Sequence, residues 1–145
     1  MARKAKTISA RKAKGRRLAQ EQAAALLKIS ETFGFGLTNE DIRPVSSGVP
    51  GEDLWLSPKA RDHFPFSFEC KNQETVSFWK WWKQCEANAG IHTPVLVIKK
   101  NLEEIKIVVD LATFSGLLYA DELRSYKSHQ SSDSNPEDPH DTVAS

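Results

Sequence analysis

The segment Phe66–Asn72 constrains the fold more than any other part of the chain. Its apolar residues alternate with polar ones, which predicts a β-strand with one face in a core. The apolar face carries Phe66, Phe68 and Cys70. The opposite, wetter face carries Ser67, Glu69 and Lys71. Core packing gives no reason to place a carboxylate and an ammonium two residues apart, so we expect Glu69 and Lys71 to reach one groove together.

A second carboxylate lies close to this strand in the sequence. Asp53 begins the preceding predicted strand and can approach Glu69 from there. Two carboxylates can hold a hard cation such as Mg²⁺, which prefers oxygen ligands and keeps water for a substrate phosphate. A lysine beside them can orient or activate the attacking water. This combination of side chains is suited to the hydrolysis of phosphodiesters.

The three residues Asp53, Glu69 and Lys71 resemble the signature of the PD-(D/E)xK nuclease superfamily. The spacing from Asp53 to Glu69 suits one strand, a turn and a second strand. The residue before the aspartate is Glu52 rather than the proline of the family pattern, although a Pro-Gly pair just upstream keeps the turn chemistry. The resemblance covers residues 15–118, which is most of the chain.

The resemblance implies a metal-dependent active site that uses Mg²⁺, for which Mn²⁺ can substitute. The implied metal ligands are Asp53, Glu69, the main-chain carbonyl of Cys70, and Glu21 on an upstream helix. Gln84, in the helix after the Glu-x-Lys strand, is implied to support Lys71. From its helix position alone, Glu21 is better interpreted as a solvated glutamate. The resemblance of residues 15–21 to the first-helix motif of the junction resolvases makes the two interpretations equally good.

Charge is unevenly distributed along the chain, although the net charge is only +1. Eight lysines and arginines precede the first acidic residue, Glu21, and acidic residues gather near the end. We expect the basic arm, a Ser-Gly loop and a Lys-Lys pair to contact DNA phosphates. These residues are Arg11, Lys12, Lys14, Arg16, Arg17, Ser46, Ser47, Lys99 and Lys100. A mitochondrial transit peptide is the alternative for the arm, and an ordinary surface turn for the loop.

The chain has no apolar run of the length that a secretory signal or a membrane span requires. Its two cysteines, Cys70 and Cys85, suit a reducing compartment and match no common zinc motif. We therefore expect a cytoplasmic protein, in the host cytoplasm if a phage encodes it. Mitochondrial targeting remains the alternative.

Hydrophobic periodicity predicts an α/β fold with a mixed sheet of about five strands flanked by helices. The resemblance implies that this sheet is restriction-endonuclease-like. The predicted order is αβββαββα. We expect helices near residues 10–32, 77–90 and 110–118, and strands near residues 39–45, 53–57, 66–72, 93–100 and 104–109. The predicted domains are a basic arm (1–14), a nuclease domain (15–125) and a disordered acidic tail (126–145).

The length of the chain, its single domain and its basic first helix most resemble small archaeal and phage Holliday-junction resolvases. That resemblance implies a homodimer that cuts four-way DNA junctions, with roles in recombination and repair. Trp79 and Phe114 are candidates for the dimer surface, and Trp79 is alternatively a base-stacking or half-buried packing residue. Two other functions stay open: another structure- or sequence-specific endonuclease of the restriction or repair type, and a DNA-binding protein without catalysis.

Overall fold

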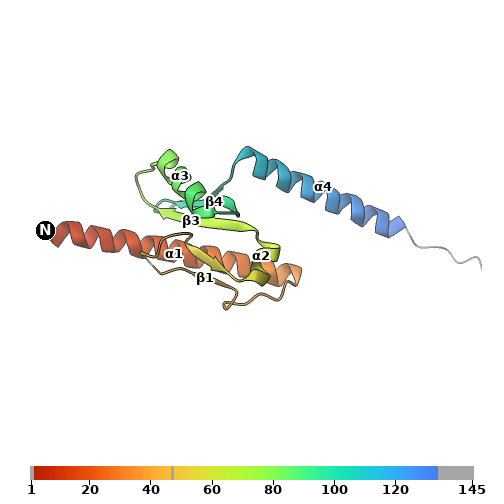
Figure 1. Cartoon of the computed structure of the whole chain (residues 1–145), viewed down its shortest axis with the longest axis horizontal. Helices are drawn as coiled ribbons and strands as arrows, with labels where there is room; N and C mark the ends of the chain where they lie inside the picture. Colours follow the sequence, from red (N-terminus) through yellow and green to blue (C-terminus); the bar gives the residue numbers. More distant parts are fainter. Residues whose placement is uncertain (1, 47, 134–145) are drawn as a thin grey trace, which may run out of the picture. The chain divides into compact units, whose positions relative to one another are not determined.

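The computed structural model describes residues 2–46 and 48–133, and it divides the chain into two compact units at Val109/Asp110. The described part of the first unit contains three helices and five strands (Figure 1). They are α1 (Ala2–Phe33), β1 (Ile42–Pro44), β2 (Leu54–Leu56), α2 (Pro58–His63), β3 (Phe66–Asn72), α3 (Phe78–Ala89), β4 (Thr93–Lys99) and β5 (Lys106–Val108). The described part of the second unit is α4 (Leu111–Asp133).

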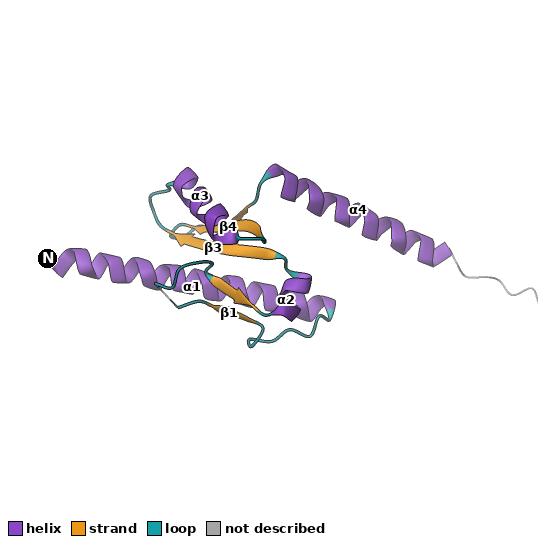
Figure 2. Cartoon of the chain, in the orientation of Figure 1, coloured by secondary structure: helices purple, strands orange, loops and turns teal. Residues whose placement is uncertain are grey.

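The predicted mixed α/β class is confirmed, but the described strands form two sheets rather than one (Figure 2). β1 and β2 make an antiparallel pair. In the second sheet, β4 pairs in parallel with β3 and antiparallel with β5. The predicted order lacks the helix α2, which explains part of the difference between one predicted sheet and two observed sheets. Ser57 caps it by accepting a hydrogen bond from the Ala60 N–H, and Pro58 occupies its first turn, so the chain leaves β2 after three residues.

The sheet of β3 and β4 is covered on both faces, with α1 on one side and α3 on the other (Figure 1). Leu18 of α1 packs in a core with Phe68 and Val97. On the opposite face, Trp81 and Cys85 of α3 pack against Leu96. The expectation of one wet face on β3 is therefore wrong.

The helix α1 is longer than predicted and includes the basic arm. It begins at Ala2, whereas the predicted helix begins near residue 10. Its end is a Schellman motif, in which the Phe35 N–H donates to the Ser30 carbonyl and the Gly34 N–H to the Glu31 carbonyl. Gly34 has a φ of 70°, a conformation that favours glycine at this position. The arm is thus a helical extension of the element that covers β3.

The helix α4 is also longer than predicted. Asp110 caps it, because its carboxylate accepts a hydrogen bond of 2.7 Å from the Thr113 N–H. The helix runs to Asp133 and so includes the first residues of the predicted disordered tail. The rest of that tail lies outside the described residues. No described helix combines the length and apolar character needed to cross a bilayer.

Candidate active site

Asp53 is held at the free edge of β3 by two hydrogen bonds. The backbone groups of β3 alternate in direction, and Pro65 and Gln73 bond to β4 at 3.1 and 3.2 Å. Phe68 and Cys70 therefore direct their backbone groups to the other edge. There the Phe68 carbonyl accepts from the Asp53 N–H at 2.9 Å, and the Cys70 N–H donates to Asp53 Oδ2 at 2.7 Å. The start of β2 is thereby fixed against the middle of β3.

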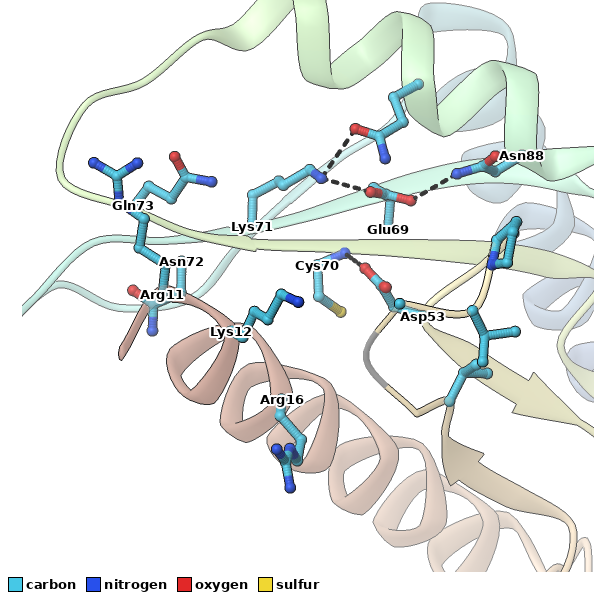
Figure 3. A pocket seen from close by; sticks show the side chains of 17 residues that line it. Arg11, Lys12, Arg16, Asp53, Glu69, Cys70, Lys71, Asn72, Gln73 and Asn88 are labelled. Carbon is cyan, nitrogen blue, oxygen red and sulfur yellow. Dashed lines mark hydrogen bonds and ion pairs between the residues drawn. The ribbon is translucent and has the colours of Figure 1, made fainter. Parts of the chain in front are cut away.

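Glu69 lies on the face of β3 that α3 covers, and both of its oxygens have partners (Figure 3). Lys71 Nζ lies 2.7 Å from Glu69 Oε1, and Asn88 Nδ2 donates to Oε2 at 3.2 Å. Lys71 Nζ also donates to Gln84 Oε1 at 3.0 Å. Glu69 is only 2% exposed, so these contacts replace the water that a carboxylate normally binds. Gln84 and Asn88 are one helical turn apart on α3, matching the spacing of Lys71 and Glu69 on β3.

Electrostatics at this edge disfavour two free negative charges. Burial, opposed in part by the Cys70 N–H, raises the pKa of Asp53 from its ordinary value to about 6. The same shift of the Asp53 pKa includes a smaller upward contribution from the charge of Glu69 and a downward one from the Lys71 ammonium. A cation bound between the two carboxylates would relieve their repulsion.

A cavity of about 600 Å³ joins these side chains to the basic part of α1. One wall is formed by the end of β3, by α3 and by the loop that precedes β2, and the facing wall is α1 (Figure 3). The basic residues of the α1 wall are Arg11, Lys12 and Arg16. The polar residues of the other wall include Asp53, Glu69, Lys71, Asn72, Gln73, Gln84 and Asn88. The cavity therefore places a cationic wall opposite a pair of carboxylates.

The donor atoms at this edge fit a hard divalent cation. Asp53 and Glu69 supply carboxylate oxygens, and the strand alternation directs the Cys70 carbonyl to the same edge. In the part of the chain that the structure describes, no three His, Cys, Asp or Glu side chains converge as a metal site. Any further ligands would therefore be backbone carbonyls, water or substrate oxygens.

Glu21 does not line this cavity. It lies five residues beyond Arg16 on α1, which is about 7.5 Å along the helix axis. Its carboxylate instead pairs with Lys99 Nζ at 3.3 Å, and about half of its side chain is exposed. Glu21, predicted as a fourth metal ligand, thus forms a surface ion pair that joins α1 to the end of β4.

The predicted DNA-contacting residues fall into two groups. Arg11, Lys12 and Arg16 line the cavity, and Ser46 lines an adjoining hollow together with Arg16. The other residues do not line this cavity. Lys14 donates to Asn101, and Lys99 pairs with Glu21. Arg17 is exposed, and Lys100 lines a hollow beside Trp81. Ser47 lies outside the described residues.

Two sets of contacts at this edge were missed from the sequence. Asn88 binds Glu69, and its position four residues after Gln84 was the available signal. Arg61 of α2 donates to the Glu52 carboxylate and to the Phe66 carbonyl. That contact fixes the residue before Asp53, at the position where the family pattern has proline. Only the packing of α2 reveals it.

Comparison with known proteins gives one family match. A family model described as "Phage putative PDDEXK endonuclease" matches residues 12–143. Because the match covers most of the sequence, the chain belongs to this family, which confirms the resemblance to the PD-(D/E)xK nuclease superfamily. No curated protein and no solved structure gave a significant match.

Proposed function

We propose that the chain is a Mg²⁺-dependent endonuclease that hydrolyses DNA phosphodiesters. The observation that carries this proposal is the convergence of Asp53, Glu69 and Lys71 in one cavity whose facing wall is cationic. A carboxylate pair suits the cation, and the cationic wall suits the phosphate backbone. The family to which the chain belongs supports the same class of reaction.

Asp53, Glu69 and the Cys70 carbonyl would hold the ion. When bound, Mg²⁺ neutralises charge on the scissile phosphate and lowers the pKa of water. Lys71 has three N–H groups, and the hydrogen bonds to Glu69 and Gln84 use two of them. The third can orient a water or contact a phosphate oxygen. Asn88 keeps Glu69 in position by binding its second oxygen.

The α1 wall would bind the DNA backbone rather than read bases. Arg11 and Lys12 are exposed and line the cavity together with Arg16; Lys12 points toward Asp53, whereas Arg16 points away from the carboxylates (Figure 3). Long cationic side chains at such a position neutralise phosphates without sequence preference. This wall orients one strand so that its phosphate meets Asp53 and Glu69.

The substrate in this proposal is a four-way DNA junction, cut by a homodimer in the cytoplasm of the host cell. The support is the resemblance of the chain to small junction resolvases, together with one candidate cavity in the described part of each chain. Two symmetric cuts need two such cavities, and a twofold dimer supplies them. Trp79 and Phe114 are exposed and available for an interface.

The test is cleavage of labelled four-way junction, flap, linear duplex and single strand by the purified protein in Mg²⁺, Mn²⁺ or EDTA. We expect cleavage in either metal, fastest on the junction, and no cleavage in EDTA. Asp53→Ala should abolish cleavage but leave DNA binding within a few fold, whereas Asp62→Ala, an exposed carboxylate on α2, should leave cleavage unchanged. The absence of cleavage of any substrate in both metals would overturn the proposal. Equal rates on junction and duplex would instead favour the restriction or repair type.

A further inference from the structure

The turn between β4 and β5 carries a leucine in an unusual place. The Glu103 N–H donates to the Lys100 carbonyl at 3.2 Å, which closes a four-residue turn. Leu102 is its third residue and has a φ of 61°, the sole positive φ of a non-glycine residue in the described ranges. Glycine or asparagine is usual at such a position. Leu102 is also fully exposed, so neither its backbone conformation nor burial explains the presence of leucine.

The turn is held rigidly beside the cavity. The Asn101 N–H donates to Glu74 Oε1 at 2.9 Å, and Asn101 Oδ1 accepts from Lys14 Nζ at 2.7 Å. The residue before the leucine is thus bonded to α1 and to the loop after β3. These two hydrogen bonds fix the direction in which the turn projects.

The same two hydrogen bonds connect the turn to the active-site cavity. Lys14 and Glu74 line a hollow of about 210 Å³. This hollow shares Arg11, Asn72 and Gln73 with the larger cavity, so the two adjoin each other. Together the two hollows extend from the two carboxylates along the end of β3 to Lys14 and Glu74, which bind the turn that carries Leu102.

We propose that Leu102 is a wedge that inserts between neighbouring bases of the bound DNA and unstacks one step. This inference rests on the proposed function, because it requires DNA to lie along the cavity. Apolar side chains on a rigid support unstack and kink duplexes in this way. The charge of Glu104, two residues further on, is compensated by Lys106 at 3.2 Å. Unstacking costs least where the duplex is flexible or already interrupted, so the wedge favours branched over linear DNA.

The chain offers matched variants for the test. Leu102→Asn removes the apolar side chain and suits the left-handed conformation, so it should raise Tm. Leu102→Met keeps an apolar side chain of similar volume. Ile91→Asn is the control, because Ile91 is almost fully exposed at the opposite end of β4 and lines neither hollow.

The measurement is the fluorescence of 2-aminopurine placed at each step beside the branch point of a four-way junction, with Ca²⁺ to permit binding without cleavage. The wild type, Leu102→Met and Ile91→Asn should raise the fluorescence severalfold at one step. Leu102→Asn should abolish most of that rise while still binding the junction. An undiminished rise with Leu102→Asn, or its disappearance with Leu102→Met, would overturn the proposal. A wild type that unstacks the junction in Ca²⁺ but does not cut it in Mg²⁺ would overturn only the proposed nuclease function.

Discussion

Asp53 illustrates how a candidate active site opposes the stability of the folded protein. Its pKa is raised to about 6, mainly by burial and then by Glu69, against an ordinary value near 4 for the unfolded chain. The folded protein therefore binds the Asp53 proton more tightly than the unfolded chain does. The penalty is absent below about pH 4 and complete above about pH 6. In the absence of a cation, Asp53 thus lowers stability at neutral pH.

We expect Asp53→Asn to raise the Tm of the protein in EDTA by a few degrees at pH 7.5 and by much less at pH 4. The reason is that asparagine keeps an oxygen for the Cys70 N–H but carries no charge. Thermal unfolding at the two pH values measures this difference, with Asp62→Asn as the exposed control. A lower Tm for Asp53→Asn at pH 7.5 would contradict the electrostatic argument.

Addition of Mg²⁺ at pH 7.5 should make the Tm of the wild type higher than that of Asp53→Asn, the reverse of the order in EDTA. The wild type gains stability because a cation binds only the folded site, by roughly RT ln(1 + [L]/Kd). Asp53→Asn should gain little, since it lacks one of the two carboxylates. Equal Mg²⁺-dependent shifts in both proteins would show that the ion binds elsewhere.

Asn88 is a positioning residue, and its removal should affect turnover more than DNA binding. It acts through Glu69, whose Oε2 it binds, so Asn88→Ala frees that carboxylate to move. We expect kcat to fall about tenfold, equivalent to the removal of about one hydrogen bond, with KM nearly unchanged. Glu86→Ala, on the same helix but bonded to Trp82, is the matched control. A higher KM at constant kcat would indicate that Asn88 binds substrate instead.

At the scale of elements, the sequence predicts which side chains lie together when both belong to the same strand or helix. Glu69 and Lys71 share a face of β3 because they are two residues apart, and this prediction holds in the structure. Gln84 likewise reaches Lys71 from α3. For the pair on β3 local periodicity is sufficient, whereas the contact between Gln84 and Lys71 was expected only from the family resemblance.

Features that depend on how elements pack were not predictable in this way. Glu21 is on the expected helix, but the position of α1 along β3 brings it to Lys99 rather than to the cavity. The helix α2 was missed because Ser57-Pro58 is equally compatible with a turn or a helix cap. The burial of Glu69 follows from α3 covering β3, which alternation within one strand cannot reveal.

The basic segment of α1 leads to a prediction about ionic strength. For duplex DNA, the slope of log K against log salt falls in magnitude by about 0.9 for every phosphate that the protein no longer neutralises. Replacing both Arg11 and Lys12 by alanine should therefore flatten the slope by about 1.8 and weaken binding, while α1 stays helical. Binding isotherms at several salt concentrations give the slope.

Lys28→Ala is the control for this experiment. Lys28 is an exposed lysine of the same helix, and it pairs with Glu31 away from the cavity. Its replacement should leave the slope unchanged. An unchanged salt slope for the variant without Arg11 and Lys12 would contradict an electrostatic role of the arm and would favour a targeting function for it.

At the scale of the whole molecule, the proposed cleavage of two strands of a junction requires two active sites. The described residues provide one candidate cavity with the carboxylate pair, so a monomer can only nick. A twofold dimer presents two identical cavities and buries the same surface on both chains. Exposed apolar residues such as Trp79 and Phe114 are the expected contributors to that surface.

We expect light scattering to give twice the mass of the 16.3 kDa chain at micromolar concentration. A mixed dimer of wild type and Asp53→Ala should nick one strand of a four-way junction, whereas the wild-type dimer should cut two opposing strands. The mixed dimer is the sharper measurement, because it links assembly to cleavage within one complex. A protein that remains monomeric and cuts linear duplex as fast as junction would contradict both the dimer and the junction assignment. The pair of Asp53 and Glu69 would then still serve a nuclease, one that acts on a single strand at a time.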